Sequence, residues 1–192
     1  FSSILGWFHR GYVDVVGYTY GSHPILYSSG NQPFMPMMCS GEYGFNCNYM
    51  PIVKESNKRK ALAFWREGLR LEHIHVGYSF LSFYKVIESQ FKQGKKKVNW
   101  INSEILTLTG EAGNRVKELQ HNKIDAGLHV FKSCRCAVAH ASLGGEIIDP
   151  DIPEDRTRIQ QDLIIVHALA EKFIREELNI PDEMDVYKGR NA

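Results

Sequence analysis

Arg135 and His140 are the two residues of this chain whose types and spacing could do chemistry. Four small or apolar residues, Cys-Ala-Val-Ala, separate them. A guanidinium carries a permanent positive charge and a forked set of donors that suits a phosphate. An imidazole titrates near neutral pH and can take or give a proton. The pair is therefore a candidate catalytic site, and its use depends on the elements that position it.

Arg135 lies at an unexpected place on its own helix, which the sequence predicts over about residues 123–141, before Gly144-Gly145. At 100° per residue, Arg135 falls within about 60° of four apolar positions of that helix. These are Ile124, Leu128, Phe131 and Val138. A charge in the middle of an apolar stripe is costly unless it is paired or faces a wet cleft. The pattern predicts that Arg135 has a partner or a functional task.

His140 is expected to point away from Arg135 if the helix is continuous. Five residues turn an α-helix by about 500°, which leaves the two side chains roughly 140° apart. They can serve one phosphate only if the helix unwinds near Ala139 or if a second protomer completes the site. The face that carries His140 holds small or polar residues: His129, Ser133, Cys136 and Ala137. Such a face would admit a partner closely, which favours a dimer cleft.

Composition bounds the class of protein. The chain has 192 residues, 43% hydrophobic and 23% charged, which is typical of a soluble globular protein with one domain and a core. The formal net charge of +1 gives no global electrostatic argument for nucleic acid, membrane or acidic partners. No apolar run approaches the roughly 18 residues that span a bilayer, so no membrane association is expected.

The cysteines and the first residue bear on the cellular setting. Cys134 and Cys136 point to different sides of a helix and cannot easily bridge each other, which favours a reduced, cytoplasmic protein. The sequence begins with Phe1 rather than methionine, which is compatible with a fragment of a longer protein.

The chain divides near residue 53. Residues 1–53 carry only three charged side chains, Arg10, Asp14 and Glu42. The run at 12–20 is β-branched and aromatic, and a turn signal and a second apolar run follow it, so this segment is predicted to be irregular or a β-hairpin. Residues 54–180 are predicted to be helical almost throughout, and residues 181–192 form a C-terminal tail. The predicted fold class is mainly α, a helical bundle with a small N-terminal segment.

Apolar positions three and four apart define the helices of residues 54–180. They recur from residue 57 to 91, as one long helix or two in succession with Gly68 and Gly77 as candidate breaks. Short helices are predicted at about 98–107 and 112–120. Asp151 as N-cap and Pro153 in the first turn predict the start of the last helix. Its buried side would hold Ile159, Leu163, Val166, Ala170, Phe173 and Ile174.

These elements resemble the HEPN superfamily, whose helical bundles carry an arginine, four to six residues and then a histidine late in one helix. The likeness is greatest for the MauJ-like, Apea-like branch. It rests on four stretches: Arg66 to Leu69, Phe80 to Glu88, Arg135 to Ala141, and Asp149 to Asp151. Together with the final helix, they cover roughly residues 57–180.

The resemblance implies a homodimer in which two Arg–His pairs line a shared cleft and cleave RNA without metal or cofactor. Arg135 would bind the phosphate, and His140 would act as acid, base or ligand of the ribose 2′-hydroxyl. Relatives of this kind work in toxin–antitoxin and antiviral defence settings, which implies an antitoxin or another domain of a longer chain as partner. Lys95, Lys96 and Lys97 would bind RNA phosphates beside the cleft, or else be solvated surface.

A non-catalytic role for the pair stays open. Active HEPN ribonucleases usually place Asn, Asp or His directly after the arginine, whereas this chain has Cys136, a poor hydrogen-bonding residue. Arg135 could instead form a buried ion pair, with His140 at the helix end, where a cation is favourable. The partner would be one of three carboxylates: Glu67, Glu72 or Glu88. The chain would then be a HEPN-like dimerisation module or a nucleotide- or RNA-binding module.

Residue spacing predicts no metal site. His73 and His75 are two residues apart and face different directions on a helix, which favours surface or capping roles. Cys39 and Cys47 lack a nearby pair to complete a tetrahedral set. Cys136 could be a redox-sensitive thiol beside Arg135, although its size also suits a core position.

Overall fold

The computed structural model describes residues 2–10, 50–139, 148–149 and 151–190. Helices dominate these residues and no strand occurs among them, which confirms the mainly α fold class. The predicted β-hairpin within residues 12–27 lies outside the described residues, and so does His140. Among the described helices, none combines the length and the apolar character needed to cross a membrane.

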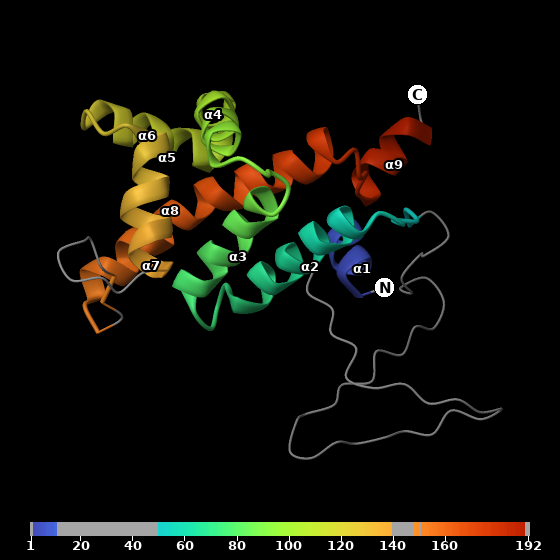
Figure 1. Ribbon diagram of the computed structural model, residues 1–192, viewed down its shortest axis with the longest axis horizontal. Coiled ribbons are helices and arrows are strands. Elements are labelled where there is room, and N and C mark those ends of the chain that lie inside the picture. Colours follow the sequence, from blue (N-terminus) through green and yellow to red (C-terminus); the bar gives the residue numbers. More distant parts are fainter. Residues whose placement is uncertain (1, 11–49, 140–147, 150, 191–192) are drawn as a thin grey trace, which may run out of the picture.

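Helices follow one another along the chain with short connections. In order, they are α1 (Ser2–Phe8), α2 (Ser56–Leu71), α3 (Val76–Glu88), α4 (Gly94–Glu104), the 3₁₀ turn η3 (Ile105–Thr107), α5 (Gly110–His121), α6 (Ala126–His129), the π-helix η4 (Val130–Cys136), α7 (Ala137–Ala139), α8 (Pro153–Lys172), the π-helix η5 (Phe173–Glu177) and α9 (Glu183–Arg190). Figure 1 shows α8 running through the domain, with the α2–α3 pair on one side and α4 and α5 on the other.

The helical pattern over residues 57–91 is two helices, α2 and α3, which turn at residues 72–75 and pack against each other. Gly68 is a packing site rather than a break, because a Cβ there would lie 2.7–2.8 Å from the Phe83 ring. His75 is the N-cap of α3, and its Nδ1 accepts a hydrogen bond from the Tyr78 N–H at 3.2 Å. The capping role predicted for His75 is confirmed.

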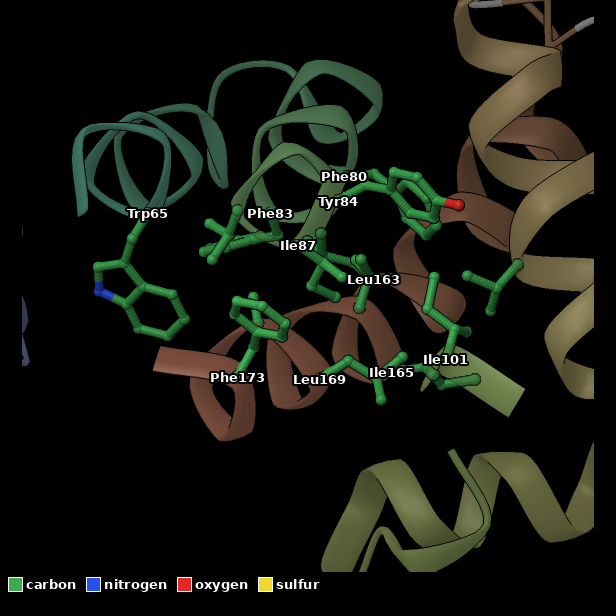
Figure 2. Packing of buried hydrophobic residues seen from close by; sticks show 14 of the residues in the cluster. Trp65, Phe80, Phe83, Tyr84, Ile87, Ile101, Leu163, Ile165, Leu169 and Phe173 are labelled. Carbon is green, nitrogen blue, oxygen red and sulfur yellow. The ribbon is translucent and has the colours of Figure 1, made fainter. Parts of the chain in front are cut away.

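The core lies between α3 and α8. Figure 2 shows Phe83, Tyr84 and Ile87 of α3 in one layer with side chains from α8 and η5. The buried side predicted for the last helix is confirmed at all six positions: Ile159, Leu163, Val166, Ala170, Phe173 and Ile174. This layer holds the two helices in register, and so it also fixes the carboxylate of Glu88 at the end of α3.

The start of α8 differs from the prediction by one residue. The N-cap is Ile152, which makes no side-chain capping bond, and Pro153 is the first helical residue. Asp151 is not the N-cap, because it belongs to the turn before the helix, where its backbone N–H donates to Asp149 Oδ1 at 2.9 Å. The proline signal was correct and the capping signal was wrong.

α1 packs on α2 and on the segment after η5. Trp7 is fully buried and meets Trp65 edge to face, with ring centroids 5.2 Å apart. Its indole N–H is directed at the carbonyl oxygens of Ile180 and Pro181, both at 3.2 Å. The low-charge N-terminal segment therefore contributes a helix to the core.

Asp182 is a buried carboxylate that ties α1 to this segment. Its side chain is fully buried and accepts hydrogen bonds from Arg10 Nε and Arg175 Nη2, both at 2.8 Å. The backbone N–H of Asp185 donates to its other oxygen at 2.8 Å. Burial alone would raise the pKa of Asp182, but the Asp185 N–H and the two guanidinium groups together lower it to about 2.

Candidate functional site

Arg135 is carried by a π-helix, not by the continuous α-helix that the sequence predicts. The α-helical turn α6 gives way to η4 at Val130, and α7 begins at Ala137. A π-helical turn holds an extra residue, so the count of 100° per residue fails across it. Val130, Cys134 and Ala137 are buried, whereas Leu128 is 50% exposed. The predicted apolar stripe is confirmed at Phe131 and Val138, which pack against the core, and is wrong at Ile124 and Leu128, which are exposed, because the π-helical turn rotates the buried face.

Arg135 forms an ion pair with Glu88 at the end of α3. Its Nη2 lies 3.2 and 3.3 Å from the two carboxylate oxygens. Burial by itself would lower the pKa of Arg135, but the Glu88 carboxylate raises it. The Arg135 side chain remains 22% exposed, so it lies at the edge of the core. The prediction of a carboxylate partner is confirmed, and Glu88 is that partner.

Glu88 also holds Lys97, whose Nζ lies 2.5 Å from Oε1. The Lys97 side chain is 9% exposed, and its ammonium lies over the rings of Tyr84 and Phe131, at 5.2 and 5.9 Å from the centroids. Burial alone would raise the pKa of Glu88, but Lys97 and Arg135 lower it below its ordinary value. Glu88 therefore stays ionised at neutral pH.

Glu88, Lys97 and Arg135 together form a unit that we call the Glu88 cluster. It contains the cations of Lys97 and Arg135 and the carboxylate of Glu88, and Arg135 is its more exposed cation. The Tyr84 hydroxyl beside it is buried and has no hydrogen-bond partner among the described residues. Burial, aided by the negative charge of Glu88, raises the pKa of Tyr84, which keeps the phenol neutral.

The three lysines predicted to bind RNA do not share one environment. They lie in the first turn of α4. Lys95 and Lys96 are exposed, whereas Lys97 is buried against Glu88. An exposed basic patch at this position would therefore consist of Lys95 and Lys96, and Lys97 serves the Glu88 cluster instead.

Part of the face expected to meet a partner is used within the chain. Ala137 is 2% exposed, and its carbonyl accepts a hydrogen bond from the Ile148 N–H at 3.2 Å. His129 is 10% exposed and is bound to Asp162 of α8. The expectation that these two residues lie on an open face is wrong, because the π-helix turns them toward the core. Ser133 and Cys136 remain half-buried.

A second polar cluster lies on the other side of η4, around Asp162. The Asp162 side chain is fully buried and accepts from Arg115 Nε and His129 Nε2, both at 2.8 Å. The Cys134 Sγ lies 3.5 Å from the same oxygen that His129 contacts. Burial alone would raise the pKa of Asp162, but the bonds from His129 and Arg115 lower it. The pKa of the Cys134 thiol is raised, both by burial and by the negative charge of Asp162.

The sequence does not predict this Asp162 cluster. Its members come from α5, α6, η4 and α8, and their spacing along the chain has no regular pattern. A signal that could have indicated it is Asp162 itself, an acidic residue inside the apolar pattern of the last helix. A charge at such a position requires partners.

Fold and site together define a mainly helical domain in which a π-helix presents an arginine from an ion cluster. The family model for methylamine utilization protein MauJ matches residues 61–175, which run from α2 into η5. The chain belongs to this family, and the MauJ-like likeness stated from its motifs is confirmed. The matched range includes Glu88, Arg135, His140 and Asp162. Comparison with curated proteins and with solved structures finds no match.

Proposed function

We propose that the chain is an endoribonuclease of the HEPN type that works without a metal ion. In this proposal, Arg135 and His140 line a cleft shared by the two protomers of a homodimer. The observation that carries it is that the Arg135 side chain remains 22% exposed at the end of η4 although Glu88 binds its Nη2, so the guanidinium is both oriented and accessible to solvent.

Arg135 is suited to bind a phosphate. Within the Glu88 cluster, the buried Lys97 supplies a charge that balances Glu88. A phosphate that reaches Arg135 meets a guanidinium, which is permanently charged and carries a forked set of N–H donors. A donor that is already oriented costs no reorganisation when negative charge grows in the transition state, which is how fixed donors accelerate a reaction.

His140 is the proposed proton-transfer group. It follows Arg135 by five residues in the same motif, and an imidazole can take the proton from a ribose 2′-hydroxyl or deliver one to the leaving oxygen. The 140° divergence predicted for a continuous α-helix does not apply, because part of the interval belongs to a π-helix. Lys95 and Lys96 would add phosphate contacts beside the cleft.

The resemblance to HEPN ribonucleases supports the proposed setting. It suggests RNA as substrate, cytoplasmic action in toxin–antitoxin or antiviral defence, and an antitoxin or another domain as partner. These are proposals that follow from the ribonuclease assignment, and they fail with it.

RNA cleavage by the purified full chain in excess chelator tests the proposal. The native protein, Arg135→Ala and His140→Ala are compared, with Arg156→Ala and His121→Ala as matched controls at exposed positions. We expect each site variant to lose at least about 100-fold in rate, and both controls to keep the native rate. Absence of cleavage by the native protein, or equal rates in all variants, contradicts the proposal. A strictly monomeric protein in light scattering contradicts the shared cleft.

A second candidate function is a non-catalytic RNA-binding or dimerisation module. Two observations favour it: Glu88 already occupies one edge of the Arg135 guanidinium, and Cys136 stands where active relatives have a polar residue. This function predicts RNA binding without cleavage, or a dimer that binds no RNA. A fluorescence anisotropy titration beside the cleavage assay separates these outcomes.

A further inference from the structure

Three metal-ligating atoms converge beneath η4, in the Asp162 cluster. His129 Nε2, Cys134 Sγ and a carboxylate oxygen of Asp162 all lie within 4.8 Å of one another. The two contacts to the Asp162 oxygen measure 2.8 Å from His129 and 3.5 Å from Cys134. Cys134 and Asp162 are fully buried, and His129 keeps a narrow exposed edge.

The π-helix creates this convergence. His129 and Cys134 are five residues apart, and on a continuous α-helix they would diverge by about 140°. In a π-helix, the hydrogen-bonded turn closes at the fifth residue, so residues five apart stack on one face. η4 begins directly after His129 and includes Cys134, so both side chains reach Asp162 of α8. π-helical turns recur at functional sites, and here the turn assembles a set of ligands.

We propose that His129, Cys134 and Asp162 bind a zinc ion, with water as the fourth ligand. Imidazole, thiolate and carboxylate are the three protein ligand types that Zn²⁺ uses, and a thiolate disfavours harder ions such as Mg²⁺ and Ca²⁺. Zinc bond lengths of about 2.0–2.3 Å place tetrahedral ligand atoms about 3.3–3.7 Å apart. The Cys134–Asp162 distance already fits, and the His129–Asp162 contact has to open by about 0.5 Å.

Charge and hydrogen bonding around the site suit a dication. Zn²⁺ displaces the thiol proton of Cys134, which passes to solvent, and the neutral imidazole of His129 would bind the ion through Nε2 with its own proton on Nδ1. The dication then faces a thiolate and a carboxylate, which neutralise it. Arg115 contacts the other oxygen of Asp162 at 2.8 Å and is itself paired with Glu118 at 2.8 Å. Arg115 thus orients the carboxylate from outside, as outer partners of metal ligands do.

Zinc at this site would pin η4 to α8. The ion would join two helices that otherwise meet through hydrogen bonds to Asp162, and it would fix the π-helical turn that precedes Arg135. Because a metal that binds only the folded state stabilises it by mass action, zinc is expected to raise the melting temperature. This inference does not depend on the proposed ribonuclease activity.

Cobalt titration of the metal-stripped full chain tests the site, since Co²⁺ occupies zinc sites and a thiolate ligand gives a charge-transfer band in the near ultraviolet. The native protein and Cys136→Ser should show this band at one ion per chain, and Zn²⁺ should abolish it. Cys134→Ser should lose it. Cys136 is the matched control because it lies two residues away, on the same helix and outside the cluster.

His129→Gln keeps a hydrogen-bond donor for Asp162 and removes the imidazole ligand. Its affinity for Zn²⁺ should fall at least about tenfold. If Cys134→Ser does not fold, this variant decides, with circular dichroism as the check on its fold. Absence of the cobalt band in the native protein, a band that persists in Cys134→Ser, or unchanged affinity in His129→Gln would overturn the proposal. The second of these outcomes would place the metal at another cysteine.

Discussion

The Arg135 guanidinium spans both carboxylate oxygens of Glu88, at 3.2 and 3.3 Å, and so links the π-helix η4 to the end of α3. The Glu88 carboxylate thereby contributes to the orientation of the residue that the ribonuclease proposal assigns to the phosphate. The same carboxylate neutralises the buried ammonium of Lys97. Glu88 is consequently a structural and a positioning residue at once, and the two roles can be measured separately.

Replacing Glu88 with Gln should destabilise the fold. The amide keeps the size of the side chain but leaves the Lys97 ammonium, 9% exposed, without its counter-charge. We expect the free energy of unfolding to fall by about 1–3 kcal/mol, measured by urea denaturation. Glu111→Gln, at an exposed position in the first turn of α5, is the control and should change it by less than about 0.5 kcal/mol. Equal stabilities of the two variants would contradict this role of Glu88.

A methyl group at Gly68 should loosen the α2–α3 pair. The added Cβ would lie 2.7–2.8 Å from the Phe83 ring, which is itself fully buried and cannot withdraw freely. We expect Gly68→Ala to cost about 1–3 kcal/mol, despite the better helix propensity of alanine. Gly94→Ala is the matched control, since no atom lies within 4 Å of its Cβ position. Thermal melts of both variants test this, and an unchanged melting temperature for Gly68→Ala would show that the helices are not in close contact there.

Asp182 should make the fold sensitive to acid. Its folded-state pKa is about 2, below the roughly 3.9 of an unfolded aspartate. The stabilisation is therefore complete above about pH 4 and is lost as the pH falls toward 2, where the carboxylate becomes protonated in the folded protein.

Asp182→Asn separates this contribution from those of the other carboxylates. The variant should be less stable at pH 7 by about 2 kcal/mol, because Arg10 and Arg175 lose their shared buried partner. Its stability should then fall less steeply than that of the native protein between pH 4 and 2. Denaturation curves at a series of pH values give both quantities, and parallel acid profiles for the two proteins would contradict the assignment.

The shared cleft predicts complementation between two inactive variants. A heterodimer of Arg135→Ala and His140→Ala protomers retains one active site with both groups, provided that each of the two sites in the shared cleft takes one residue from each protomer. Co-expression at equal amounts should restore about a quarter of the native cleavage rate, since half of the dimers are mixed and each of these has one of its two sites intact. No recovery above the single variants, with mixed dimers demonstrated by mass spectrometry, would contradict sites built from both protomers.

The helical character of residues 54–180 and the core face of α8 were predictable from the sequence, because apolar spacing at three and four residues is a strong local signal. Ile159, Leu163 and Val166 follow that rule and are buried. The start of α8 was less predictable. Residue preference favours Asp151 as the N-cap, whereas the observed N-cap is the next residue, Ile152. That Arg135 has a charged partner was also predictable, because a charge on a helix that packs against a core is energetically costly unless it is paired.

The geometry around η4 could not be predicted, because it depends on a π-helix that apolar spacing does not reveal. A helix of uniform α pitch places Leu128 near the core and turns His129 outward. The extra residue of the π-turn reverses both: Leu128 is 50% exposed, and His129 binds the buried Asp162. The choice of Glu88 among three carboxylates also depends on tertiary packing, since it requires α3 to end beside η4.

The most direct test of the central claim compares the cleavage of an RNA oligonucleotide with that of its fully 2′-deoxy counterpart. Both reactions contain excess chelator and more enzyme than substrate. The account predicts that the native protein cuts only the RNA and leaves a cyclic phosphate end. Arg135→Ala should cut at least about 100-fold more slowly, and Arg156→Ala should keep the native rate. Intact RNA after prolonged incubation with folded native protein, or cleavage of both oligonucleotides at equal rates, would contradict it.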